Sequence, residues 1–317
     1  MSSRDVTLSQ QRMLMKRLPR LKAQIVSIIS SIILMTSVHA ETCPVENPNI
    51  ESGVLKVRPL VGLNRDPRNY IQWKVSELAL EKAGIPYDFD VSSHIRAPDR
   101  GPNQLRELGS EANLIWGSIG RQKEVDFLPV RVPIFRGLSS YWYIWVREED
   151  FDKFSDVKTF ADMRRFSILQ GTNWSTIPLL EAEGLEVRSG AFLNLTKMLA
   201  RGRADALFFA AIDSQKLLDL DARELGLVPL PDVLVYHPLD QYIYVDKCSK
   251  DLHDALFSGL EAAVKDGSHE ELLREYAESS GIYERIVDGG YSLLELGNPD
   301  LTAESVITMD EYQLEFK

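Results

Sequence analysis

The sequence predicts an α/β protein of two lobes, each a mainly parallel sheet flanked by helices. Apolar runs of strand length alternate with amphipathic segments, and this alternation is typical of parallel strands joined by crossover helices. Of the 317 residues, the 277 that follow residue 40 suit two domains of roughly 100–200 residues better than a single core. Two aromatic-rich extended runs, residues 138–147 and 241–246, suit a pair of segments that cross between the lobes.

Residues 1–40 predict a secretory signal peptide. Basic residues at positions 16, 17, 20 and 22 precede an apolar run over residues 23–38, and small residues surround Ala40. A charged start, an apolar middle and a small-residue exit are typical of a segment that is cleaved after export. A retained membrane anchor is the alternative, because a spanning helix needs roughly 17–25 apolar residues. We expect cleavage after Ala40 and a periplasmic mature protein.

The mature chain is strongly acidic. The full sequence has 36 Lys and Arg against 47 Asp and Glu, and loss of residues 1–40 changes the net charge from −11 to −16. Such a charge argues against nucleic acid and against anionic membrane surfaces as partners. Two cysteines remain after export, Cys43 and Cys248, so one disulfide bond between them is expected; two separate buried thiols are the alternative.

The first part of the mature chain gives a strand–helix–strand order. Residues 54–62 predict a strand, and a polar loop with Asn64 and Arg68 follows it. A helix with apolar residues on one face ends at Gly84, and residues 87–91 alternate as a strand. Residues 92–104 are expected to form a loop, residues 105–108 a short helix and residues 113–116 a buried strand.

The stretch from residue 166 to residue 214 carries the strongest functional signal. An apolar run at 166–169 predicts a strand, and the segment Gly171, Thr172, Asn173, Trp174 and Ser175 leads into a helix that stops at Gly184. A second helix ends at Gly202, and residues 206–210 predict a buried strand. A helix that starts just after a strand directs backbone N–H groups above the sheet, where they bind anionic groups. The stretch therefore predicts a small-molecule site.

The remaining elements complete the predicted order. Residues 252–264 predict an amphipathic helix that closes at Gly267, and Ser268 with Glu271 predicts a capping box for the next helix. Residues 294–299 predict a turn.

The sequence lacks the common catalytic and cofactor motifs. It contains no G-x-S-x-G elbow, no H-E-x-x-H, no phosphate-binding loop and no G-x-G-x-x-G. The histidines of the mature chain are scattered, without metal-ligand spacing. Nothing combines a nucleophile with a base and an orienting group. We therefore expect binding without catalysis, and neither a cofactor nor a metal.

Several short motifs together resemble the periplasmic solute-binding proteins of the type II fold, near the polar amino acid (family 3) binding proteins of ABC transporters. Residues 116–121 (WGSIGR) lead to Val125-Asp126-Phe127, and then to residues 132–135 (VPIF). Gly171-Thr172 and residues 203–206 (RADA) match the second-lobe pattern of that family. The segment 134–138, the element from Gln170 to Trp174 and the Gly297-Asn298-Pro299 tail are similar to an uncharacterised group of exported chains.

The resemblance implies lobes that close on a ligand like a hinge. The first lobe would comprise residues 41–142 and 236–317, and the second residues 143–235. Arg121 would hold a ligand carboxylate through paired hydrogen bonds; a surface arginine is the alternative. Residues from Gly171 to Ser175 would line the second-lobe side, with helix capping as the alternative for the polar ones and a core role for Trp174. Ser118, Asn64, Arg68 and Tyr141 complete the expected ligand-binding set.

One departure from the family bears on the ligand. The amino acid binders carry an Asp after the second-lobe strand, where it pairs with the ligand ammonium, and this chain has Ala210 there. Asp213 would need a shifted register to serve. Arginines in the first-lobe loops, at positions 65, 68, 96 and 100, fit an anionic ligand, with solvated loop charges as the alternative.

The expected function is capture of a small polar or carboxylated solute for ABC-type uptake by a monomeric protein that delivers it to an inner-membrane permease. Presentation to a membrane sensor is the main variant. A periplasmic dehydratase-like enzyme on the same fold is the first alternative, and an interaction module with a degenerate cleft is the second.

Overall fold

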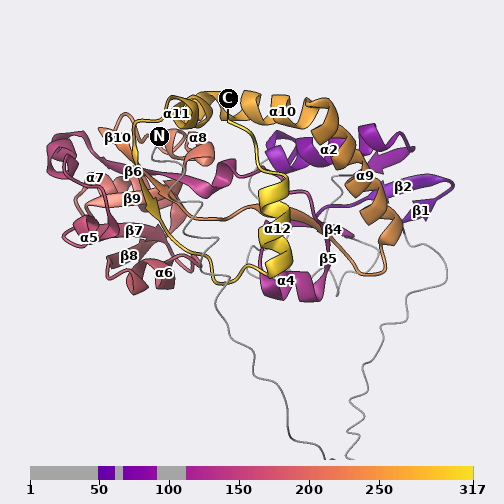
Figure 1. The fold of residues 1–317 in the computed structure, drawn as a ribbon, viewed down its shortest axis with the longest axis horizontal. Helices are drawn as coiled ribbons and strands as arrows, with labels where there is room; N and C mark the ends of the chain where they lie inside the picture. The colour runs from indigo at the N-terminus through magenta and orange to yellow at the C-terminus, as the bar shows by residue number, and fades with distance from the viewer. Residues whose placement is uncertain (1–48, 61–66, 91–111, 317) are drawn as a thin grey trace, which may run out of the picture. The chain divides into compact units, whose positions relative to one another are not determined.

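The computed structural model describes residues 49–60, 67–90 and 112–316 (Figure 1). The predicted signal peptide, Cys43, Asn64, the predicted loop at 92–104 and the predicted helix at 105–108 lie outside the described residues. Within the described part of the chain, no helix has both the length and the apolar character that crossing a membrane requires.

Two three-stranded sheets are built from the beginning and the end of the described chain. One has the order β1-β2-β3 and the other β4-β11-β5, and a parallel bridge between Pro59 and Leu114 links them. Their strands are β1 (Ile50–Glu51), β2 (Val54–Val57), β3 (Tyr87–Phe89), β4 (Leu114–Ser118), β5 (Leu128–Val130) and β11 (Gln241–Val245). Helices α2 (Ile71–Ala83) and α9 (Lys250–Asp266) pack side by side, followed by α10 (Ser268–Ala277) (Figure 1). Their apolar faces join one core with these strands.

A six-stranded sheet with the order β12-β10-β6-β9-β7-β8 forms the second group. Its strands are β6 (Tyr141–Arg147), β7 (Ser167–Gly171), β8 (Glu186–Gly190), β9 (Ala206–Ala210), β10 (Leu227–Tyr236) and β12 (Ser292–Glu295). Short helices connect them: α5 (Phe160–Met163), α6 (Ile177–Ala182), α7 (Leu195–Ala200) and α8 (Gln215–Leu218). The predicted strand at 206–210 coincides with β9. Since β12 pairs with β10, part of the C-terminal segment belongs to this sheet. The lobe boundaries at 142 and 236 stay a prediction.

The two aromatic-rich runs predicted as crossing segments become the antiparallel strands. β6 runs antiparallel to both β10 and β9, and β11 runs antiparallel to both β4 and β5. The other pairs of the six-stranded sheet, β12 with β10 and β7 with β8 and β9, are parallel.

A buried carboxylate joins the chain just before β6 to the chain just before β11. Asp240, fully buried before β11, accepts hydrogen bonds from the N–H groups of Phe135 (2.9 Å), Gly137 (2.8 Å) and Gln241 (2.7 Å). Between the first two donors, Arg136 adopts a φ of 47°, which is uncommon for a residue other than glycine. Burial raises the pKa of Asp240 to about 6, although the three N–H groups act in the opposite direction.

The segment after the last helix hydrogen-bonds to Arg136, the residue between the first two N–H donors to Asp240. Nε of Arg136 donates to the carbonyl of Tyr312 (2.8 Å), and the N–H of Leu314 donates to the carbonyl of Arg136 (3.0 Å). Tyr312 follows α12 (Ala303–Glu311), which packs against α4 (Arg121–Asp126) through Ser305 and Glu124 (Figure 1). Helix α11 (Ile282–Asp288) lies between α10 and β12 in the chain. The last residues thus contact the crossing region directly.

Two local predictions, the capping box at Ser268 and the disulfide bond of Cys248, have different outcomes. The predicted capping box at the start of α10 is wrong: Gly267 is the N-cap, and the Ser268 hydroxyl donates to Asp266 instead (2.6 Å). The aspartate two residues back competes for the hydroxyl, as short polar side chains often do near turns. Cys248 is disulfide-bonded. Its pairing with Cys43 stays a prediction, because Cys43 lies outside the described residues.

Replacing the Asp240 carboxylate should weaken the fold. In Asp240→Ala the N–H groups of Phe135 and Gly137 lose their acceptor inside the protein, so we expect the free energy of unfolding in urea to fall by roughly 3 kcal/mol. Asp240→Asn keeps one acceptor oxygen without the charge and should cost less. Asp232→Ala, at an exposed position, is the control and should change the value by less than about 0.5 kcal/mol. Equal effects of the Asp240 and Asp232 changes to alanine would contradict this role.

His269 should make stability depend on acid. It is fully buried, its Nε2 lies 2.9 Å from the carbonyl of Ile134, and burial lowers its pKa to about 4. Since the unfolded pKa is about 6.5, stability from the neutral ring is present above that pH and is lost as the pH falls towards 4. Between pH 7 and pH 4.5, the wild type should lose roughly 2 kcal/mol more unfolding free energy than His269→Gln. Parallel stability curves for the two proteins would show that His269 does not titrate in this way.

Candidate functional site

A cavity of about 280 Å³ lies where both groups of strands meet the crossing segments; we name it the crossing cavity. Ser118 and Lys123 come from β4 and α4, Ser175 from the turn after β7, and Asp300 from the C-terminal segment. The complete lining is Ser118, Ile119, Lys123, Ser175, Leu179, His237, Leu239, Asn298, Pro299 and Asp300. The cavity therefore brings together two predicted residues, Ser118 and Ser175, from the two predicted lobes.

Arg121 does not line the crossing cavity. It stands at the first position of α4, and its guanidinium donates to the carbonyls of Pro299 (3.2 Å) and Leu301 (3.4 Å). Its backbone N–H donates to the carbonyl of Asp300 (3.0 Å). Arg121 therefore holds the Asn298-Pro299 turn against α4. Its predicted role as a carboxylate ligand is not supported by these contacts.

Lys123 supplies the cation of the cavity. The aliphatic part of Lys123 passes over Gly117. A β-carbon on residue 117 would lie 3.1 Å from Cδ and Cε of Lys123, so the glycine leaves room for the lysine side chain. Desolvation lowers the pKa of the Lys123 ammonium, and the nearby Asp300 carboxylate acts in the opposite direction. Among the described residues, no carboxylate oxygen lies within the 4.0 Å that defines an ion pair with it. A half-buried ammonium without an ion pair favours an incoming anion.

His237 is an uncharged residue of the cavity lining. It is buried, its Nδ1 lies 3.2 Å from the carbonyl of Leu296, and its ring meets the edge of Trp142 at 5.3 Å. Burial lowers the pKa of His237 below its ordinary value. At neutral pH the ring is therefore neutral, and the charges of the cavity come from Lys123 and Asp300.

After β7, where the sequence predicted a ligand site at a helix start, most of the groups make contacts within the protein instead. The N–H of Thr172 donates to the carbonyl of Gly190 (2.9 Å), and Asn173 turns the chain with a φ of 66°. Trp174 covers Gly171, and its ring lies 5.9 Å from that of Phe209. The helix then starts at Ile177 and has six residues. Trp174 thus packs on the core, and of this stretch Ser175 alone is among the residues that line the crossing cavity.

The other predicted residues lie elsewhere. Tyr141 is buried in β6, 5.2 Å from the ring of Tyr236, and burial raises its pKa to about 12. Arg68 is exposed in a short 3-10 helix, Pro67–Asn69, and Asn64 lies outside the described residues. Asp213 pairs with Lys216 (2.7 Å), which gives it a structural partner.

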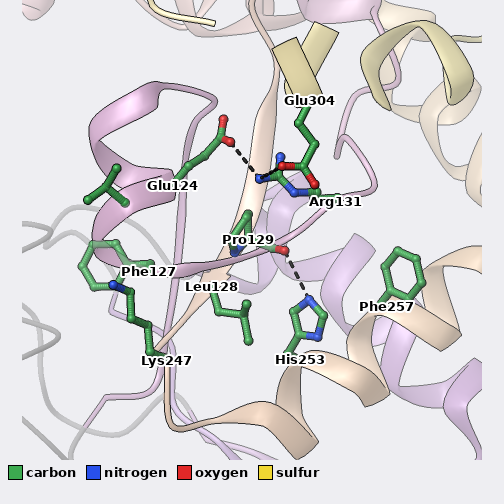
Figure 2. Close-up of a pocket in the computed structure, with 10 residues that line it drawn as sticks. Glu124, Phe127, Leu128, Pro129, Arg131, Lys247, His253, Phe257 and Glu304 are labelled. Carbon is green, nitrogen blue, oxygen red and sulfur yellow. Dashed lines mark hydrogen bonds and ion pairs between the residues drawn. The ribbon is translucent and has the colours of Figure 1, made fainter. Parts of the chain in front are cut away.

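Two other cavities fit ligand capture less well. One of about 280 Å³, lined by Lys74, Lys216 and Tyr276 among others, has Lys216 already paired with Asp213. The other, of about 570 Å³, is enclosed by α4, β5, α9 and α12 (Figure 2). There Arg131 already pairs with Glu124 (2.9 Å) and Glu304 (3.0 Å), as Figure 2 shows. None of the predicted ligand-binding residues lines either cavity.

The sequence signals for Lys123 and for residues 298–300 of the cavity lining are weak. Asn298 and Pro299 belong to the tail motif that resembles other exported chains, but the motif has no assigned role. In the sequence, nothing distinguishes Lys123 from the other charged residues of its polar segment. Asp300 joins it only because Arg121 fastens the tail to α4. Within the described residues, no group of three His, Cys, Asp or Glu side chains is arranged to hold a metal ion.

Comparison with known proteins identifies the fold. No protein-family model matches the chain, and no curated protein matches it. The crystal structure of YckB from Bacillus subtilis aligns with a TM-score of 0.53 at 16% identity, over 78% of this chain and 97% of that one. An ancestral arginine-binding protein bound to arginine aligns with a TM-score of 0.50 at 14% identity, over 71% of this chain and 98% of that one. The predicted two-lobed fold of periplasmic binding proteins is confirmed.

Gly171 should tolerate no side chain while Trp174 covers it. A β-carbon at this position would overlap the indole, so we expect Gly171→Ala to lower the free energy of unfolding by roughly 1–3 kcal/mol in urea denaturation. The double change Gly171→Ala with Trp174→Leu should recover part of the loss caused by Gly171→Ala alone. Gly297→Ala, where nothing lies within 4 Å of the added carbon, is the control. A loss in Gly297→Ala as large as that in Gly171→Ala would contradict the packing argument.

Proposed function

We propose that the protein is an extracytoplasmic solute-binding protein that captures a small polar or carboxylated solute between its two lobes. The observation that carries the proposal is the crossing cavity. Its walls come from β4 and α4 on one side and from the turn after β7 on the other, and they hold an ammonium that makes no ion pair with any described residue. A ligand there touches both groups of strands at once, which is the condition for ligand-driven closure.

The fold supports the same function. Several chain segments connect the strand groups, and the binding proteins of this fold bind ligands between such lobes. The ancestral relative in the structural comparison is named for arginine binding, which is a property of that protein. For this chain we propose a monomer that acts in the periplasm after cleavage behind Ala40. It delivers its solute to an inner-membrane permease, or presents it to a membrane sensor.

An enzyme on the same fold is the competing function. The cavity does contain an amine, a carboxylate and a neutral imidazole, at Lys123, Asp300 and His237. The imidazole, however, is aimed at the carbonyl of Leu296, and no hydrogen bond links these three side chains among the described residues. A binder returns its ligand unchanged, whereas a dehydratase converts it, so NMR of the recovered compound separates the two functions.

Ligand capture should be visible as thermal stabilisation that depends on the crossing cavity. A screen of amino acids, dicarboxylates, short-chain carboxylates, polyamines and small peptides should contain compounds that raise the melting temperature of the mature protein. At 100 times its Kd, a ligand adds ~2.7 kcal/mol of stability. Ser175→Trp fills the crossing cavity and should abolish the shift. Ser279→Trp, an exposed position lining the cavity beside Lys216, is the matched control and should retain it. A screen without stabilising compounds would favour the interaction module with a degenerate cleft.

A further inference from the structure

We infer that the Lys123 ammonium, rather than the Arg121 guanidinium, binds the carboxylate of a small aliphatic acid in the crossing cavity. This inference rests on the proposed function and names the ligand class and the residue that selects it.

Arg121 is already engaged. One of its guanidinium nitrogens donates to the carbonyls of Pro299 and Leu301, and its own backbone N–H bonds to the carbonyl of Asp300. A ligand carboxylate that took over this nitrogen would release the Asn298-Pro299 turn from α4. The contacts therefore assign Arg121 to positioning the tail, and leave the cavity with a different cation.

Lys123 meets the requirements of that cation. Its stem is guided over Gly117 towards the cavity, and its ammonium is half-buried and without an ion pair among the described residues. Desolvation without a partner raises the free energy of a charged group, and an incoming carboxylate relieves this cost through a charge-assisted hydrogen bond. The Lys216 ammonium, in the cavity lined by Lys74 and Tyr276, is not available in this way, because it already pairs with Asp213 at 2.7 Å.

The rest of the lining defines the remainder of the ligand. Aliphatic side chains face the same space from three different segments: Ile119, Leu179 and Leu239. They suit a short branched hydrocarbon tail, which gains about 25 cal/mol for each Å² of apolar surface removed from water. The Asp300 carboxylate, close enough to Lys123 to influence its pKa, is placed to accept a hydrogen bond from an amine or hydroxyl beside the ligand carboxylate. The cavity thus fits a branched aliphatic acid with such a donor.

Calorimetric titration of the mature protein with four compounds of similar size tests the assignment. Isocaproate carries the carboxylate alone, leucate adds a hydroxyl, leucine adds an ammonium, and isocaproamide replaces the carboxylate with an uncharged amide. We expect the wild type to bind the three acids and to bind isocaproamide at least roughly tenfold more weakly, as loss of one charge-assisted hydrogen bond predicts. The order among leucate, leucine and isocaproate reports the contribution of Asp300.

Two lysine variants localise the effect. Lys123→Met keeps the stem without the charge and should weaken binding of the acids at least roughly tenfold, while Lys216→Met should leave it within about twofold. Without ligand, Lys123→Met should melt no lower than the wild type, because it removes an ammonium without an ion pair. Unchanged binding in Lys123→Met, or a lower melting temperature of that variant without ligand, overturns the assignment to Lys123. Wild-type protein that binds none of the acids but binds other solutes at the crossing cavity overturns the ligand class and leaves the proposed function standing; binding of no solute overturns both.

Discussion

The Asp240 carboxylate fixes the geometry on which the two-lobed arrangement depends. The segment just before β6 and the segment just before β11 pass between the strand groups, and each must satisfy its backbone N–H groups outside a regular sheet. Asp240, on the second of these segments, accepts N–H bonds from Phe135 and Gly137 on the first. A single buried side chain therefore holds these two segments together.

The crossing cavity follows from this constraint and from the way the C-terminal segment returns. β12 adds a strand to the six-stranded sheet, and the chain then passes over the start of α4, where Arg121 holds the carbonyls of Pro299 and Leu301. This return brings Asp300 to the side of Lys123. Arg121, which we expected to hold a ligand carboxylate, donates to the protein's own backbone, and Lys123 is the cationic residue that lines the cavity.

Patterns that depend on neighbouring residues were predictable from the sequence. The alternation of strands and helices, the strand at 206–210 and the extended conformation of the runs at 138–147 and 241–246 all rest on local hydrophobicity. The site was less predictable, because its charged residues come from segments far apart in the chain. Trp174 shows the limit: its position after Gly171 left stacking on a ligand and a core role both open, and only the contact with Phe209 shows that it packs on the core. The capping box at Ser268 failed for a similar reason, since Asp266 offered the hydroxyl a nearer acceptor.

The fastening of the chain end to Arg136 has a mechanical consequence. Tyr312 and Leu314 hydrogen-bond to this residue, and Phe316 lies against the rings of Tyr141 and Tyr283. A change in the backbone torsions of Arg136 would therefore be passed on to residues 312–316 through these hydrogen bonds and ring contacts.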